Sequence, residues 1–176
     1  MAEFASTSFD SDAGVFSLTQ IRHLMRVEFS RAQRYDYPLS CIVLACDRID
    51  HLRDLYGIEF KEAVLGEVID LLQNATRTCD YLGRLMDDRL LAILPHTRRE
   101  GGEVTARRIL AAARGRVFEA DGHRLQVTLS IGLSDYENEN TMFFDSLVES
   151  AQEALAVAAA NGGDQFVYRS PSPRAR

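Results

Sequence analysis

Arg77 and Asp80 have the spacing of a small binding site, three positions apart between a predicted helix and a predicted strand. An arginine guanidinium offers a planar fork of donors for phosphate or for a purine edge, and a carboxylate accepts hydrogen bonds from a base. A local basic patch is added by Arg98, Arg99, Arg107 and Arg108. An ordinary explanation also exists, because a solvated Arg–Asp pair contributes under about 1 kcal/mol and exposed helix faces are often charged.

Metal and thiol chemistry find less support in the sequence. The histidines share no metal-ligand spacing; they are His23, His51, His96 and His123. The cysteines form no CxxC pair; they are Cys41, Cys46 and Cys79. Buried thiols in a reducing compartment are the favoured interpretation. We therefore predict no metal site and no cofactor.

Length and charge limit the function further. The chain has 176 residues and a net charge of −6, which fits one domain and argues against a general nucleic-acid or membrane-surface binder. No apolar run approaches the roughly 20 residues of a membrane helix, and the start has no signal-peptide pattern. We predict a cytoplasmic protein with a flexible segment over 1–15, a folded domain over 16–170 and a flexible tail over 171–176.

Hydrophobic periodicity predicts the elements that position these residues. Apolar spacing favours a first helix from Leu18, and later helices over 50–57, 60–72, 104–113 and 141–160. Short apolar or alternating runs favour strands over 39–46, 81–86, 90–94, 124–133 and 165–168. Asp87 and Asp88 stand at the turn of a predicted hairpin, since Asp tolerates the left-handed backbone that such turns need. This order predicts an α/β (α+β) domain with helices on one sheet.

Six local sequences, taken in order, resemble the GGDEF family of diguanylate cyclases over roughly residues 29–168. They are Arg31-Ala32-Gln33-Arg34-Tyr35, Asp54-Leu55-Tyr56-Gly57, Arg84-Leu85, Leu91-Ala92-Ile93-Leu94-Pro95, Val127-Thr128-Leu129-Ser130-Ile131-Gly132 and Glu153-Ala154-Leu155. The resemblance implies a nucleotide-cyclase or palm-like fold with a central, mainly antiparallel sheet and flanking helices. It also implies chemistry in which two GTP molecules are joined into cyclic di-GMP with metal held by carboxylates.

The catalytic positions implied by this resemblance are altered. The signature falls at Met86-Asp87-Asp88-Arg89-Leu90, where both glycines are absent and Arg89 replaces an acid. The metal-ligand aspartate falls at Ala45 and the second acid of that motif at Asp47. The guanine-reading pair falls at Arg53 and Glu62, and the phosphate-binding pair at Ala159 and Gly163. We therefore predict a degenerate domain with no catalytic residue and no cyclase activity.

A second sequence, Gly162-Gly163-Asp164-Gln165-Phe166, imitates the family signature. It follows a long predicted helix and does not bridge two hairpin strands. Capping of that helix by Gly162 explains the glycines better than catalysis does.

The product-binding motif of the family, RxxD, is retained. It falls at Arg77-Thr78-Cys79-Asp80, and a second arginine of that site falls at Arg108. The resemblance thus predicts a receptor that binds cyclic di-GMP through Arg77, Asp80 and Arg108 and signals to a protein partner, with a ligand-linked homodimer left open. A protein-interaction domain that binds no nucleotide, and a divergent GTP-binding cyclase, remain as alternatives.

Overall fold

A five-stranded sheet forms the centre of the molecule, in a computed structural model that describes residues 14–120, 122–136 and 143–171. The strand order is β2-β3-β1-β6-β7, and only β6 and β7 run parallel. The strands are β1 (Leu39–Cys46), β2 (Tyr81–Arg84), β3 (Leu90–Pro95), β6 (Leu129–Tyr136) and β7 (Gln165–Tyr168). The predicted mainly antiparallel sheet is confirmed.

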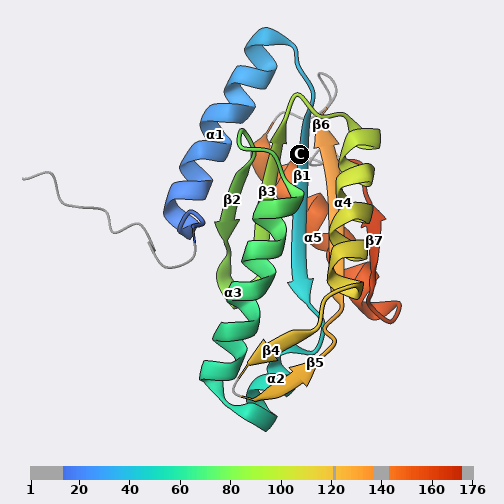
Figure 1. Ribbon diagram of the computed structural model, residues 1–176. Helices are drawn as coiled ribbons and strands as arrows, with labels where there is room; N and C mark the ends of the chain where they lie inside the picture. The colour runs from blue at the N-terminus through green and yellow to red at the C-terminus, as the bar shows by residue number, and fades with distance from the viewer. Residues whose placement is uncertain (1–13, 121, 137–142, 172–176) are drawn as a thin grey trace, which may run out of the picture.

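Helices cover both faces of this sheet (Figure 1). Helices α1 (Leu18–Tyr35) and α5 (Phe144–Ala160) pack on one face, where Cys41 and Val43 of β1 point. Helices α3 (Ile58–Ala75) and α4 (Arg99–Arg114) pack on the other face, with Ile42 and Leu44 of β1. Alternate residues of β1 therefore enter opposite cores, which is why this strand reads as an unbroken apolar run.

Local sequence explains where several helices begin and end. Ser17 caps α1 through a reciprocal pair of hydrogen bonds with Gln20. Gly57, with φ of +93°, separates α2 (Ile49–Tyr56) from α3. Helix α4 (Arg99–Arg114) begins five residues before its predicted start and includes Gly102 as a buried residue, where an added Cβ would lie 2.8 Å from Cδ1 of Leu133. That glycine is a packing residue and does not interrupt the helix.

The predicted strand over 124–133 is wrong in one respect. Residues His123–Leu125 (β5) pair with Phe118–Ala120 (β4) in a separate two-stranded sheet, and β6 begins only at Leu129. Leu125, Val127, Leu129 and Ile131 nevertheless reach the same core. The alternation continues while the strand partner changes, so periodicity alone joins two strands into one.

The segment before α1 is part of the folded structure from Gly14 onward. Val15 is buried in the core, and Phe16 lies beside Gly83 of β2 as an isolated parallel bridge. The flexible segment predicted before it lies, for residues 1–13, outside the described residues, as do residues 172–176 of the predicted tail. None of the described helices combines the length and apolarity needed to span a bilayer.

Candidate functional site

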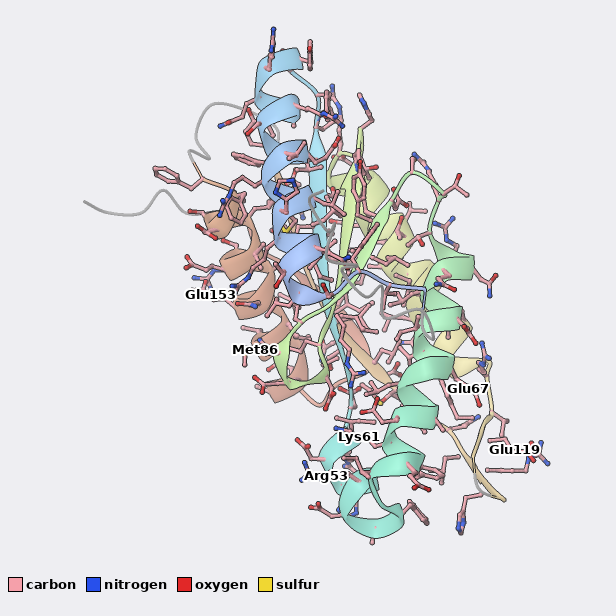
Figure 2. All side chains as sticks on the ribbon, turned by 90° about the vertical axis from the view of Figure 1, so that its left-hand side faces the viewer. Arg53, Lys61, Glu67, Met86, Glu119 and Glu153 are labelled. Carbon is pink, nitrogen blue, oxygen red and sulfur yellow. The ribbon has the colours of Figure 1, made fainter. Side chains whose placement is uncertain are left out.

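The loop between β2 and β3 carries the residues at which the resemblance places the family signature. Met86–Asp88 form a single 3-10 turn, and Leu90 begins β3. Asp87 and Asp88 have φ of 58° and 60°, the left-handed backbone predicted for this turn. The Met86 side chain is 66% exposed at the loop (Figure 2). The loop thus presents a thioether and a carboxylate where paired glycines would leave bare backbone.

Ion pairs bind this loop to α3. The Lys61 ammonium lies 2.7 Å from Oδ2 of Asp88, and the Arg84 guanidinium lies 2.6 Å from Oδ1. Arg84 also pairs with both carboxylate oxygens of Glu62 at 3.0 Å. We call these four residues (Lys61, Glu62, Arg84 and Asp88) the signature-loop ion network. Its two cations and two anions neutralise each other.

Both carboxylate oxygens of Asp88 are therefore already paired with cations. Burial opposes its ionisation, but hydrogen bonds from Lys61 and Arg84 outweigh burial and lower its pKa. Lys61 is itself buried, with 8% of its surface exposed. The sequence reasoning assigned no role to Lys61, although one signal was available: it is the only lysine in the chain.

The other carboxylate near the implied metal position has a structural role. Asp47 accepts hydrogen bonds from the Thr128 hydroxyl at 2.7 Å, the Ser130 hydroxyl at 2.6 Å and the Asp164 amide at 3.0 Å. These bonds join the end of β1 to β6 and to the turn before β7. Within the described ranges, no three His, Cys, Asp or Glu side chains are grouped so that they could hold a metal ion.

The implied base and phosphate positions are also occupied by structural contacts. Arg53 pairs with Asp50 and Asp54 at 3.0 Å, and Glu62 is held by Arg84. Gly162 and Gly163 form the left-handed turn from α5 into β7, with φ of +105° and +75°. The GGDQF sequence is thus a helix-to-strand turn, as predicted, and an added Cβ at Gly163 would lie 2.6 Å from the Asp47 carboxylate.

Arg77 and Asp80 lie together at a hollow between the end of α3 and the start of β2. The hollow has a volume of about 250 Å³, and its lining includes Gly14, Gln73, Arg77, Asp80 and Leu82. Oδ2 of Asp80 accepts a hydrogen bond of 2.7 Å from the Arg77 backbone amide. Oδ1 is buried and has no hydrogen-bond partner among the described residues. One carboxylate oxygen therefore fixes the turn, and the other remains an unused acceptor.

The electrostatics of Asp80 follow from this position. Burial raises the pKa of its carboxyl, while the Arg77 amide and the charges of Arg77 and Arg108 partly offset that effect. The three residues predicted for the ligand site are thus within electrostatic reach of one another. Their arrangement suits a ligand with hydrogen-bond donors for Asp80 and negative charge for the arginines.

Arg108 lines a second hollow of about 190 Å³ with Asn74, Ala75, Ala112 and Arg116. The end of α3 contributes to both hollows, through Gln73 to the first and through Asn74 and Ala75 to the second. Arg116 is engaged with Glu67 at 3.1 Å. By contrast, the guanidinium groups of Arg77 and Arg108 form no ion pair with any described residue.

Comparison with known proteins gives a consistent family match. The family described as "Diguanylate cyclase, GGDEF domain" matches residues 7–165. Diguanylate cyclase A of Treponema denticola is 30% identical over 142 residues, covering 81% of this chain and 38% of that protein. Diguanylate cyclase DgcS of Shewanella oneidensis is 28% identical over 154 residues, covering 88% and 50%. The chain thus spans half or less of these relatives.

Solved structures share the fold at low sequence identity. The GGDEF domain of FimX from Pseudomonas aeruginosa has a TM-score of 0.84 at 21% identity, covering 93% of this chain and 99% of that one. The GGDEF domain of DgcB from Caulobacter crescentus, in complex with c-di-GMP, has a TM-score of 0.84 at 15% identity, covering 96% and 98%. Diguanylate cyclase SiaD of Pseudomonas aeruginosa, in complex with its activator SiaC, has a TM-score of 0.83 at 24% identity, covering 91% and 61%.

Proposed function

The chain belongs to the GGDEF family, and we propose that it is a catalytically inactive member that binds cyclic di-GMP at Arg77, Asp80 and Arg108 and relays the signal to a protein partner. The observation that carries this proposal is that Arg77 and Asp80 line one hollow, while the guanidinium groups of Arg77 and Arg108 form no ion pair with any described residue. Arginines without an ion-pair partner offer donors for phosphate or for guanine O6 and N7, and a neighbouring carboxylate is an acceptor for guanine N–H groups.

Cyclic di-GMP offers the chemistry that this site lacks. Its guanines carry N–H donors for the Asp80 carboxylate, and its two phosphates carry negative charge for Arg77 and Arg108. Arginine can also pair with guanine O6 and N7 or stack on the purine plane. The DgcB GGDEF domain was solved in complex with c-di-GMP, which supports the same ligand class here.

The signature-loop ion network supports inactivity. Asp88 is already saturated by Lys61 and Arg84, and Glu62 is engaged by Arg84. A metal ion at Asp88 would have to displace Lys61 and Arg84 from that carboxylate, and the Glu62 carboxylate at 3.9 Å would then be the remaining internal partner of the buried Lys61 ammonium. In addition, Ala45 offers no side-chain oxygen, and the Asp47 carboxylate accepts three internal bonds.

Calorimetric titration with cyclic di-GMP tests the binding part of the proposal. We expect saturable binding by the wild-type protein and at least tenfold weaker binding by Arg77→Ala, since a charge-assisted bond contributes about 1.5–3 kcal/mol. Arg98→Ala is the matched control, because Arg98 lies just before α4 and likewise forms no ion pair with a described residue. Equal affinity of all three proteins would refute the site.

A direct assay tests the catalytic part. Purified protein incubated with GTP and Mg²⁺ should form no cyclic di-GMP that chromatography can detect. Formation of the product above a no-enzyme control would show a working cyclase. Saturable binding of GTP with Mg²⁺, without turnover, would instead favour the alternative of a remodelled nucleotide pocket.

The proposed function also includes a protein partner that receives the signal. SiaD was solved in complex with its activator SiaC, so a domain of this fold can belong to a protein assembly. For this chain, the expected readout is a partner whose capture from the native host depends on cyclic di-GMP and is lost with Arg77→Ala. Ligand-independent capture would favour the nucleotide-independent interaction domain.

A further inference from the structure

One wall of the Arg77–Asp80 hollow comes from the segment before α1. Gly14 and Phe16 both line the hollow. We call Gly14–Phe16 the edge segment, because it pairs with the outer edge of β2. In Figure 2, the chain preceding α1 passes across β2 toward α3. None of the sequence motifs that define the family site includes this segment.

Three sets of contacts hold the edge segment in place. The Phe16 amide donates to the Leu82 carbonyl at 2.8 Å, and the Arg84 amide donates to the Phe16 carbonyl at 3.0 Å. Val15 is buried in the core with 5% of its surface exposed. The Gln73 side-chain amide donates to the Gly14 carbonyl at 3.0 Å. Phe16 also packs against the core below α1, with its ring centroid 6.5 Å from that of Tyr81. Backbone pairing, the apolar contacts of Val15 and Phe16, and the Gln73 clamp from α3 therefore dock the segment.

The clamp depends on glycine at position 14. Gly14 has a left-handed backbone with φ of +65°, and an added Cβ would lie 2.3 Å from Nε2 of Gln73. A larger residue would be strained in backbone and would displace the clamp. Gly14 and Gln73 also line the hollow, so they lie at the same surface as Asp80 and Arg77.

We infer that ligand binding at Arg77 and Asp80 is coupled to docking of the edge segment, because the segment and its clamp build one wall of the ligand site. This inference rests on the proposed function. A ligand that fills the hollow contacts the docked segment and stabilises it. By reciprocity, loss of docking weakens the ligand by the same factor. The edge segment leads directly into the chain before Gly14, so this coupling gives ligand occupancy a route to that part of the protein.

The edge segment pairs with β2 through an isolated bridge, whereas β1 pairs with β6 over eight residues, which favours such a role. Segments at the edge of a fold open with lower free energy than core strands, which open only with global unfolding. The Phe16 and Arg84 amides report this opening, because both donate hydrogen bonds across the edge. Their hydrogen exchange therefore measures docking without reference to any enzymatic activity.

The test is hydrogen exchange of these two amides with and without cyclic di-GMP, together with calorimetry of variants. In the full chain, saturating ligand should slow exchange at Phe16 and Arg84 by about fivefold or more, the lower end of ordinary coupling. Gln73→Ala and Gly14→Val should each speed exchange in the free protein and weaken ligand binding by a similar factor. Gly66→Ala is the control, since Gly66 lies in α3 with nothing within 4 Å of an added Cβ.

The possible failures are distinguishable. Saturable binding with unchanged exchange at both amides, or unchanged affinity in both Gln73→Ala and Gly14→Val, would overturn the coupling and leave the proposed function intact. Absence of binding by the wild-type protein would overturn the proposed function and the coupling together. The two variants act differently, one by removing the clamp and one by strain, so misfolding of one leaves the other as a test.

Discussion

The Asp80 carboxylate has a structural role in the turn, and the proposed function adds a binding role. Oδ2 holds the turn through the Arg77 amide, and Oδ1 is buried without a partner among the described residues. Burial raises the pKa of this group. A raised pKa for an acid means that folding favours the protonated form, so stability falls as the pH rises past the unfolded-state pKa near 3.8, and the full loss is present above the folded-state pKa.

Asp80→Asn should therefore separate stability from binding. The asparagine carbonyl can still accept from the Arg77 amide, but the buried charge is gone. We expect the free energy of unfolding at pH 7 to rise by about 0.5–1 kcal/mol, as when a strained functional group is removed. Cyclic di-GMP affinity should fall at least tenfold, because a neutral acceptor replaces a charged one.

Urea unfolding and calorimetry on the same preparations check this prediction. Asp80→Ala serves as the comparison, since it also removes the bond to the Arg77 amide and should lose both stability and binding. A drop in stability for Asp80→Asn equal to that of Asp80→Ala would show that Asp80 is a purely structural residue.

At the same scale, sequence reasoning placed Arg77, Asp80 and Arg108 near one another but did not find Lys61. The motif residues are close along the chain or anchored to a neighbouring predicted element. The partner of Lys61, by contrast, is Asp88, 27 positions away on a different element. A pair of this kind depends on how α3 lies over the hairpin, which periodicity does not specify.

At the scale of elements, the signature-loop ion network joins the β2–β3 hairpin to α3. Only 10% of the Lys61 side chain and 19% of the Asp88 side chain are exposed. Removing Asp88 alone leaves the Lys61 ammonium poorly solvated, whereas removing both Lys61 and Asp88 leaves neither charge. The Lys61 and Asp88 charges thus matter to stability mainly because each would be poorly solvated without the other.

Asp88→Ala should lower the free energy of unfolding by about 1–3 kcal/mol, because the poorly solvated Lys61 ammonium then keeps only the more distant Glu62 carboxylate, at 3.9 Å. The double variant Lys61→Met/Asp88→Ala should recover at least half of that loss, since the methionine fills similar space without charge. Urea denaturation of the wild type, both single variants and the double variant forms a complete cycle. Additive losses would show that the pair is not coupled.

The same pair predicts an acid dependence. The Asp88 pKa is lowered in the folded protein, so its contribution to stability is present above the unfolded-state pKa near 3.8 and is lost as the pH falls through the folded-state value. The stability difference between wild type and Asp88→Ala should therefore shrink below pH 4. A difference that stays constant from pH 7 to pH 3 would contradict this assignment.

Element boundaries show where sequence reasoning succeeds and fails. Strand β1 agrees with its predicted range, since a short apolar run between two turns is typical of a buried strand. Hairpin β4–β5 was missed because Leu125 and Val127 continue the alternation of β6 into the same core. The start of α4 was missed because Gly102 serves close packing against Leu133. Both errors come from tertiary contacts that override a local signal.

At the scale of the whole molecule, charge is distributed unevenly. The net charge is −6, yet the stretch from Arg98 to Arg116 holds six arginines. Four of them are engaged: Arg99 and Arg107 with Glu103, Arg114 with Asp164, and Arg116 with Glu67. Arg98 and Arg108 form no ion pair with a described residue, and Arg108 is the one that lies near Asp80.

A dianionic ligand at this site should bind less tightly as salt rises. Exposed charges interact over a screening length of about 10 Å at 0.1 M and about 3 Å at 1 M salt, so attraction of the phosphates to Arg77 and Arg108 weakens across that range. We expect the affinity for cyclic di-GMP to fall several-fold between 0.05 and 0.5 M NaCl. The net negative charge of the chain adds repulsion at low salt, so a net fall identifies local attraction as the stronger effect.

Arg108→Ala should make this salt dependence shallower, whereas Arg98→Ala should leave it unchanged. The two residues belong to one helical stretch and change the net charge equally, but ten residues at about 1.5 Å rise separate them by roughly 15 Å, beyond the screening length at 0.1 M salt. Calorimetry over the salt range measures both slopes. Equal slopes in the two variants would mean that only the overall charge matters, whereas a change confined to Arg108→Ala would assign the attraction to Arg108, the arginine whose charge acts on Asp80.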